Sequence, residues 1–387
     1  MFQILKTFFL LGCVSFGGPA AHIGYFRKAF VEQRRWLSEH EFANLVALSQ
    51  FLPGPGSSQL GFAIGHGRGG LAGAIAAFVG FTLPSVLLMM ALAWLSQDIM
   101  GNPYAQGIIH GLKLLAVVVV ADAVLGMFAN FCRSNRHRWL CVISAASLLL
   151  LPSLTTQIGL ILMAGLIGMG LSGGASDNTK ASVEPAATAK PNWLPLALFA
   201  ALWLLPLVSA APISTLFSQF YHAGSLVFGG GHVVLPLLQS LVGEHLSSDS
   251  FLTGYAAAQA VPGPMFALAT YLGWFLPSDA PALGAVVATV AIFLPGFLLL
   301  LGLLNSWQSL ASQPKFVGAS AAINAAVTGI LLSALYQPVF SSAVVSATDM
   351  AMVLLGFALL RLAKPPISLL ILLFVVTTTL SKVMVGY

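Results

Sequence analysis

The sequence predicts an all-α integral membrane protein made of two inverted-topology repeats, each with broken, re-entrant helical hairpins. Three observations predict this fold class. The composition is apolar, a set of glycine- and proline-rich motifs occurs once in each half, and the distribution of basic loops is reversed between the halves.

The composition places the chain in a membrane. Of its 387 residues, 58% are hydrophobic and only 7% are charged. Stretches without Asp, Glu, Lys or Arg cover residues 42–67, 69–97 and 280–314. Because a helix needs about 20 apolar residues to cross the bilayer core, these stretches supply several spans or hairpins. We therefore expect a multi-pass protein that contacts membrane lipid.

Helix-breaking motifs recur in the same order in both halves. The first half contains GCVSFGG (12–18), QFLPGP (50–55) and Leu-Pro (83–84), and the second contains GSLVFGG (224–230), QAVPGP (259–264) and Leu-Pro (294–295). Glycine and proline breaks at corresponding places in two apolar halves indicate a transport site at the interface of two repeats.

A change of composition separates the two halves. Residues 171–192 are rich in Ser, Gly, Ala, Thr and Pro and are predicted to be a linker between repeats at 1–170 and 217–387. Residues 193–213 form a joining apolar segment. If residues 139–170 make two short helices broken at Pro152, the number of crossings before the second repeat is odd. Either residues 139–170 cross the membrane only once, or the joining segment at 193–213 does not make a single crossing.

The charges of the loops predict that the repeats are inverted, because cytoplasmic loops are enriched in Lys and Arg. In the first half, basic residues lie at 27–35, at Arg68 and at 133–138, whereas 98–103 has none. The corresponding second-half loops have the opposite character. Residues 241–250 and 277–281 have acidic but no basic residues, the loop before Phe316 has Lys315, and 341–349 has no basic residue.

The Pro-Gly-Pro segments are predicted to be the tips of re-entrant hairpins. Arg35 and Arg68 lie on the same side only if residues 42–65 enter and leave the membrane there. Proline fixes its backbone angle and glycine permits a sharp turn, so residues 53–55 and 262–264 are the expected tips. Entering from opposite sides, the tips would meet near the midplane, where broken backbone is tolerated if protein buries it or it lines a polar cavity.

These motifs resemble those of the chromate ion transporter family, in its long-chain form made of two homologous halves. The resemblance covers nearly the whole chain. It is carried by FGGPAAH (16–22), Trp36-Leu37, QFLPGP (50–55), FGGGH (228–232) and QAVPGP (259–264). It implies export of chromate across the bacterial inner membrane, with chromate resistance as the result and sulfate as a structural mimic.

The broken motifs are the expected site for a tetrahedral oxyanion, because free N–H groups and the positive dipole end of a helix favour an anion. The second tip, with Met265 and Phe266, is less polar than the first, so the first half is expected to supply more of the contacts. The breaks can alternatively be packing kinks. The candidate substrate-binding residues are Gly17, Gly18, His22, Gln50, Pro53, Gly54, Pro55, Ser57, Ser58 and Lys113 in the first half, and Gly229, Gly230, His232, Gln259, Pro262, Gly263 and Pro264 in the second.

Four ionisable side chains are candidates for specific roles. His22 and His232 follow the double-glycine motifs and could donate to an oxyanion, or could bond to backbone carbonyls instead. Lys113 and Asp122 lie within an apolar segment, where a charge costs at least ~2.5 kcal/mol. Lys113 could offset the charge of the anion. Asp122 could couple transport to protons, or could pair with a basic residue of another helix.

The membrane potential favours export as the direction. Moving a dianion outward through an inside-negative membrane releases about 4.6 kcal/mol per 100 mV. Export, with protons as the coupling ion, is therefore the first hypothesis, and import of sulfate or another oxyanion is the second.

An intramembrane enzyme is disfavoured, because the sequence places no acid/base partner beside Ser57 or Ser58. No metal or cofactor is expected, since the three cysteines lack metal-ligand spacing. The Lys and Arg residues lie mostly in short loops, which argues against nucleic acid as a partner. The sequence leaves the oligomeric state open, with a homodimer as one option.

Overall fold

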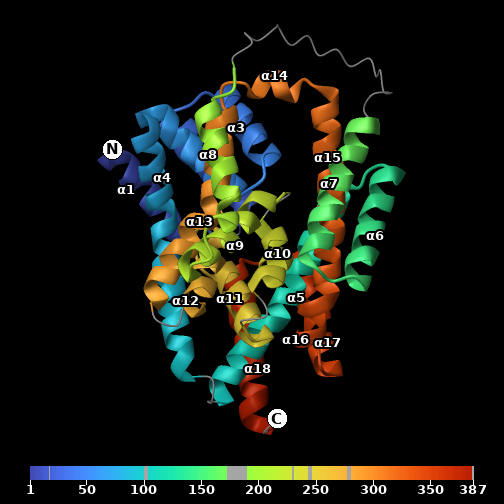
Figure 1. Ribbon diagram of the computed structural model, residues 1–387. Helices are drawn as coiled ribbons and strands as arrows, with labels where there is room; N and C mark the ends of the chain where they lie inside the picture. Colours follow the sequence, from blue (N-terminus) through green and yellow to red (C-terminus); the bar gives the residue numbers. More distant parts are fainter. Residues whose placement is uncertain are drawn as a thin grey trace.

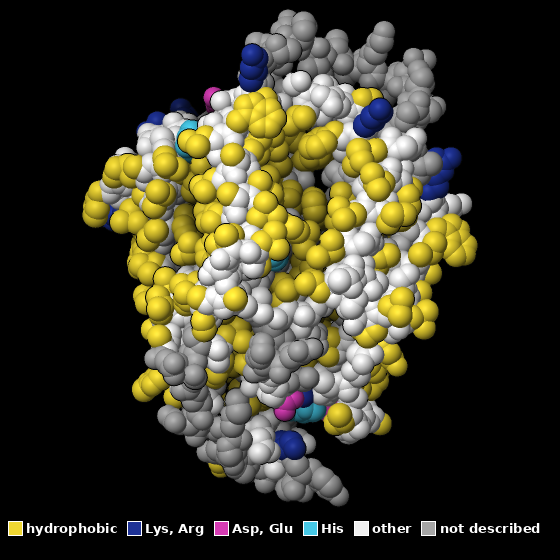
Figure 2. Space-filling model, viewed as in Figure 1, with side chains coloured by type: hydrophobic (Ala, Val, Ile, Leu, Met, Phe, Trp, Pro, Cys, Tyr) yellow, Lys and Arg dark blue, Asp and Glu magenta, His cyan; other side chains and the backbone are white. Residues whose placement is uncertain are grey.

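The computed structural model describes residues 1–16, 18–99, 103–171, 190–228, 231–242, 246–276 and 280–385 (Figure 1). The described residues form helices and turns, and no strand occurs among them. Four helical segments are long and apolar enough to cross a membrane: Gly56–Ser96, Gln106–Phe131, Pro281–Leu303 and Pro314–Ala343. Hydrophobic side chains cover the middle of the molecule, and Lys and Arg gather mainly toward its upper end (Figure 2). The predicted all-α membrane fold is confirmed.

The first repeat contains seven α-helices and a π-helical turn among its described residues. They are α1 (Phe2–Val14), α2 (Gly18–Phe26), η1 (Arg27–Gln33), α3 (Glu39–Phe51), α4 (Gly56–Ile99), α5 (Pro103–Phe131), α6 (Asn135–Leu150) and α7 (Leu154–Leu171). Helix α3 begins with a capping box, in which Ser38 and Glu41 satisfy each other's backbone N–H groups. The backbone N–H and hydroxyl of Ser38 lower the pKa of the exposed Glu41 carboxyl.

The second repeat follows the same order after a joining helix, α8 (Trp193–Trp203), and the short turn η2 (Leu205–Leu207). Its elements are α9 (Pro212–Leu226), η3 (Gly231–Val233), α10 (Val234–Val242), α11 (Ser248–Ala260), η5 (Met265–Ala267), α12 (Leu268–Phe275), α13 (Pro281–Leu303), α14 (Trp307–Ala311), α15 (Pro314–Ala334), η6 (Leu335–Phe340), α16 (Ser341–Ala343), α17 (Ala347–Ala358), η7 (Leu359–Ala363) and α18 (Ile367–Val385).

Helix α4 is a hairpin of two helices. Its backbone leaves the helical region at Gly69 and at Gly70, where φ is +58°. The two arms touch so closely that a Cβ atom added to Gly73 would lie 2.2 Å from the Gly65 carbonyl oxygen. The arms, residues 56–68 and 71–99, therefore correspond to α12 and α13 of the second repeat.

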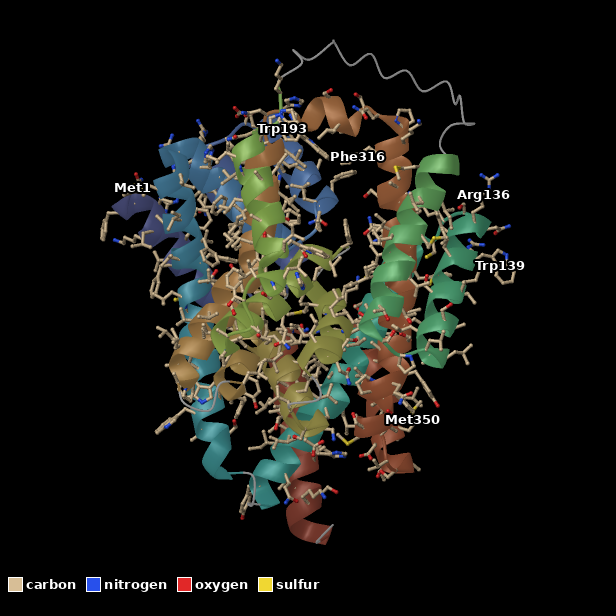
Figure 3. All side chains as sticks on the ribbon, in the orientation of Figure 1. Met1, Arg136, Trp139, Trp193, Phe316 and Met350 are labelled. Carbon is tan, nitrogen blue, oxygen red and sulfur yellow. The ribbon has the colours of Figure 1, made fainter. Side chains whose placement is uncertain are left out.

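Equivalent helices of the two repeats run in opposite directions. Helix α6 starts near Arg136 at the upper end of the molecule, whereas α17 starts near Met350 at the lower end (Figure 3). This reversal agrees with the inversion predicted from loop charges. Helices α6 and α7 turn at Pro152, and both outer ends lie at the upper end, from which α8 runs downward (Figure 1). Residues 139–170 thus begin and end on the same side of the molecule. Of the two alternatives given above, a single crossing by this region is therefore wrong.

The two repeats are interlocked. Helix α5 of the first repeat packs along α18 and α17 of the second, while α15 of the second packs along α6 and α7 of the first. Helices α1 and α4 pack together, as do their counterparts α9 and α13. The equivalent helices α5 and α15 are therefore exchanged between the halves.

Candidate functional site

The two Pro-Gly-Pro segments interrupt their helices as expected. Helix α3 ends at Phe51 and α4 begins at Gly56, while α11 ends at Ala260 and the chain resumes a helical turn at Met265. At the centre of each break, φ is +119° for Gly54 and +104° for Gly263. Residues with a Cβ atom rarely adopt these angles, so glycine is required at both tips.

Each tip binds the broken motif of the opposite repeat. The Gly54 N–H donates to the Val227 carbonyl at 2.7 Å, and the Gly263 N–H donates to the Ser15 carbonyl at 2.9 Å. Val227 and Ser15 each lie two residues before a double-glycine motif. The two hydrogen bonds are therefore equivalent, and they join the repeats at their centre.

The Leu-Pro motifs lie beside the tips as well. The Gln59 side-chain amide donates to the carbonyls of Pro53 and Gly296, at 3.0 Å each. Gly296 follows Pro295, and Ser85 follows Pro84. A Cβ atom added to Gly263 would lie 3.0 Å from the Ser85 hydroxyl oxygen. Three interruptions from each repeat thus meet in one region.

His22 is fully buried and connects the first tip to the first double-glycine motif. Its Nε2 lies 3.2 Å from the Ser15 carbonyl oxygen, which can only accept, so Nε2 carries the proton. Its Nδ1 lies 3.1 Å from the Ser57 hydroxyl, which therefore donates to it. Both ring nitrogens are used, and His22 holds Ser57 in place at the start of α4.

Several buried polar atoms in this region have no hydrogen-bond partner among the described residues. They are the hydroxyls of Ser15, Ser58 and Thr82 and the side-chain oxygen of Gln59. Unpaired buried hydroxyls can donate to an oxyanion. Ser58 and Gln59 follow the first tip and were expected there from the sequence, whereas Ser15 and Thr82 were missed. Their only sequence signal is that each lies within a few residues of a break.

The second tip has a different set of side chains. The Tyr255 hydroxyl is hydrogen-bonded to Nδ1 of His232 at 2.9 Å. The Gln259 amide lies 3.4 Å from the same nitrogen and 2.7 Å from the sulfur of Met265. His232 and Gln259 are thus brought together here, beside a thioether, while Gln50 lies next to Gly56 at the first tip.

Lys113 lies in an ion pair away from the tips. Its Nζ is 2.7 Å from a carboxylate oxygen of Asp249, in the first turn of α11. Helix α11 has 13 residues, which corresponds to about 20 Å between that turn and the tip. The side chain of Lys113 is 10% exposed and that of Asp249 is 64% exposed. Lys113 therefore has a fixed carboxylate partner.

Two further charged contacts connect α5 to the second repeat. His110 pairs with Asp349 at 2.7 Å, and Asp122 pairs with Arg361 at 2.6 Å. The Asp122 pair is the structural alternative considered from the sequence. The equivalent helix α15 has Asn324 and Ser333 where α5 has Lys113 and Asp122.

Some predicted positions lie outside the described residues. These are Gly17, Gly229 and Gly230, together with residues 172–189 of the linker. Gly18 begins α2 with φ of +76°. In the described ranges, no group of three or more His, Cys, Asp or Glu side chains is arranged to hold a metal ion.

The fold and the site define a membrane transport protein whose repeats meet through broken helices. The family model described as Chromate transporter matches residues 2–169 and 214–379. The chain therefore belongs to the chromate transporter family.

Individual relatives agree with this assignment. A probable chromate transport protein of Synechococcus elongatus is 30% identical over 342 residues, which cover 86% of this chain and 83% of the relative. A chromate transport protein of Pseudomonas aeruginosa is 30% identical over 352 residues, covering 85% and 79%. One of Cupriavidus metallidurans is 26% identical over 346 residues, covering 85% and 81%. No solved structure matches the chain.

The role of His22 can be tested by substitution. We expect His22→Ala to reduce chromate transport at least about tenfold, because it leaves the Ser15 carbonyl and the Ser57 hydroxyl without their partner, at about 1–3 kcal/mol per buried group. His66→Ala is the control, because His66 lies in the first arm of α4, as Ser57 does, but is partly exposed and makes no hydrogen bond with another described residue. Transport that is unchanged in His22→Ala contradicts this role.

Proposed function

We propose that this protein is a secondary active transporter that exports chromate across the bacterial inner membrane in exchange for protons, and so confers chromate resistance. Three of its relatives are named as chromate transport proteins, one of them as probable. The observation that carries the proposal is the pair of equivalent hydrogen bonds from Gly54 and Gly263, which brings two broken segments together where the repeats meet.

The anion is proposed to bind at the start of α4. The first N–H groups of a helix have no partner within it and favour an anion. The hydroxyls of Ser15, Ser58 and Thr82 add donors that are buried and unpaired among the described residues. A tetrahedral dianion, which only accepts hydrogen bonds, matches this set. Because these donors are neutral, the anion can also leave, as transport requires.

The direction of transport is proposed from the membrane potential. Outward movement of a dianion releases about 4.6 kcal/mol per 100 mV. Basic residues at the end of the molecule that holds the Arg27–Gln33 turn would gather the anion on the cytoplasmic side. Proton exchange would add to this driving force.

The proposal is tested by chromate uptake into everted membrane vesicles energised with a proton gradient. We expect accumulation that is absent from vesicles without the protein, is abolished by an uncoupler and is reduced by sulfate. No energised uptake of chromate, together with sulfate uptake by whole cells, would overturn export and favour an oxyanion importer.

One contact favours a function of another class. The Ser57 hydroxyl donates to Nδ1 of His22, as a nucleophilic serine does to its general base. A membrane-permeant fluorophosphonate probe separates this alternative from transport. Covalent labelling that disappears in Ser57→Ala would indicate an intramembrane hydrolase. We expect no labelling, because the other nitrogen of His22 faces a backbone carbonyl rather than a carboxylate.

A further inference from the structure

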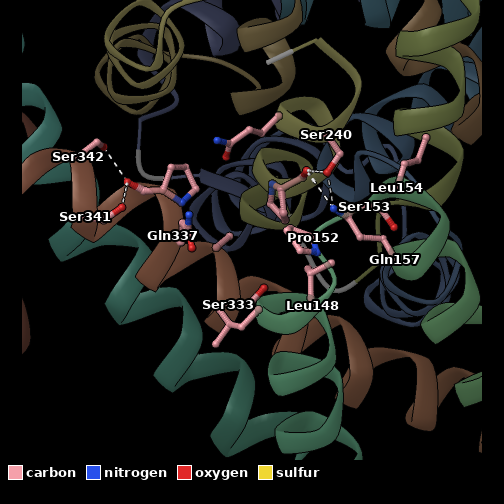
Figure 4. Close-up of a pocket in the computed structure, with 15 residues that line it drawn as sticks. Leu148, Pro152, Ser153, Leu154, Gln157, Ser240, Ser333, Gln337, Ser341 and Ser342 are labelled. Carbon is pink, nitrogen blue, oxygen red and sulfur yellow. Dashed lines mark hydrogen bonds between the residues drawn. The ribbon is translucent and has the colours of Figure 1, made fainter. Parts of the chain in front are cut away.

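A cavity of about 700 Å³ lies away from the tips, between the α6–α7 turn, α10 and the end of α15 (Figure 4). It is lined by Pro152 and Gln157 on one side and by Pro236, Gln239 and Ser240 of α10 on another. Residues from the end of α15, from η6 and from α16, among them Ser333, Gln337 and Ser342, complete the wall.

The lining is polar but uncharged. Among the described residues, no Asp, Glu, Lys, Arg or His side chain lines the cavity, whereas hydroxyls and amides do so from all three sides. The amides of Gln239 and Gln337 make no hydrogen bond with another described residue. Polar side chains without a protein partner are tolerated at membrane depth where they line a water-filled space.

Gln157 joins the α6–α7 turn to α10 at the wall of the cavity. Its side chain is only 3% exposed. Its amide nitrogen donates to the Ser240 hydroxyl and, at 3.4 Å, to the Pro236 carbonyl. Its oxygen has no partner among the described residues. That oxygen is enclosed by protein, so the amides that the cavity offers to a ligand are those of Gln239 and Gln337.

Helix α10 connects the cavity to the side chains beside the second tip. His232 lies in η3, the 3-10 turn that leads directly into α10, and Pro236 and Gln239 follow in α10. His232 contacts Tyr255 and Gln259, which lead to the tip.

The cavity also lies on the side opposite the basic loops. Helix α6 has the basic residues 133–138 at its start and the cavity at its end. Its 16 residues separate the two by about 24 Å. Arg136 marks the upper end of this helix in Figure 3.

We propose that this cavity is the outer vestibule of the transport path, where the tetrahedral oxyanion is bound by neutral hydroxyl and amide donors before release. The inference rests on the proposed function. Neutral donors replace part of the hydration shell of the anion without the attraction of a fixed cation, so the anion leaves quickly. No carboxylate among the described lining residues repels it.

Thiol accessibility tests the location of the vestibule. Gln239→Cys and Ser342→Cys are made in a chain whose three native cysteines, Cys13, Cys132 and Cys141, are replaced by serine. The control is Ser320→Cys, on α15 near the basic end. Membrane-impermeant thiol reagents are added to intact cells or to everted vesicles. We expect residues 239 and 342 to react from outside, more slowly when chromate or sulfate is present, and residue 320 only from inside.

Two outcomes overturn the proposal. One is reaction of residues 239 and 342 only from inside, and the other is no reaction there while residue 320 reacts. Either labelling result can occur in a protein that still takes up chromate into energised vesicles. The labelling assay therefore tests the vestibule separately from the proposed transport function. Conversely, residues 239 and 342 could be labelled from outside, and more slowly with sulfate present, in a protein that does not take up chromate. That result would support the vestibule but reject chromate as its ligand.

Charge substitution tests the requirement for a neutral lining. We expect Gln239→Lys to lower both KM and kcat for export, each by about tenfold, because a fixed cation retains the dianion. Gln239→Glu should raise KM, whereas Gln239→Asn should change neither constant by much. Equal kinetics in the lysine and glutamate variants would overturn the proposal.

Discussion

Replacing Gly54 or Gly263 with alanine is expected to abolish chromate transport while the protein still reaches the membrane. Both residues have positive φ angles, at +119° and +104°. A Cβ atom would also lie 3.0 Å from the Gly296 α-carbon at the first tip and 3.0 Å from the Ser85 hydroxyl oxygen at the second. Strain of about 1–3 kcal/mol at each position would weaken the hydrogen bond that joins the repeats. The measurement is energised chromate uptake into everted vesicles.

Two glycine controls separate strain from contact. Gly70→Ala adds a Cβ atom where φ is +58° but no neighbour lies within 4 Å, and Gly126→Ala adds one in open space with no unusual angle. We expect Gly126→Ala to transport normally and Gly70→Ala to lose stability without losing transport. Full activity in both tip variants would show that the tips do not form the site.

Asp249→Asn is expected to destabilise the protein more than Lys113→Met does. The side chain of Lys113 is 10% exposed, so removing its partner leaves a nearly buried cation unpaired. Asp249 is 64% exposed and can be solvated when Lys113 is removed. Since one partner faces solvent, we expect a cost of roughly 2 kcal/mol for Asp249→Asn, below that of a fully buried pair. Thermal unfolding in detergent measures the difference.

The double variant Lys113→Met/Asp249→Asn distinguishes a structural role of Lys113 from anion binding. If the pair only holds α5 against α11, the double variant should recover both stability and transport. Recovery of stability without transport would show that Lys113 also contacts the anion. Arg27→Ala, which removes exposed ion pairs with Glu32 and Glu39, is the matched control for stability and should change the unfolding temperature little.

The breaks in the fold were predictable from the sequence because their causes are local. Proline removes an N–H donor and glycine allows positive φ, so the interruptions at residues 53–55 and 262–264 follow from the residue types alone. The reversal of the repeats was likewise visible in the loop charges. The close hairpin at Gly69 and Gly70 was visible only as a basic loop.

The partners of the charged residues were not predictable, because they come from distant parts of the chain. Lys113 and Asp249 are 136 positions apart, and Asp122 and Arg361 are 239 apart. No local pattern specifies which helices will be neighbours. Ser15 and Thr82 were missed for the same reason, since only the meeting of the tips with the opposite repeat brings their hydroxyls into one region.

The exchange of α5 and α15 between the repeats has a consequence for biosynthesis. When α5 leaves the ribosome, Asp249 and Asp349, the partners of Lys113 and His110, have not been made. The nascent first half must keep these groups hydrated, or beside the insertion machinery, until the second half arrives. Helix α5 therefore reaches its final packing only after the second repeat has been synthesised. A chain truncated after the linker would lack these partners, and we expect quality-control proteases to degrade it.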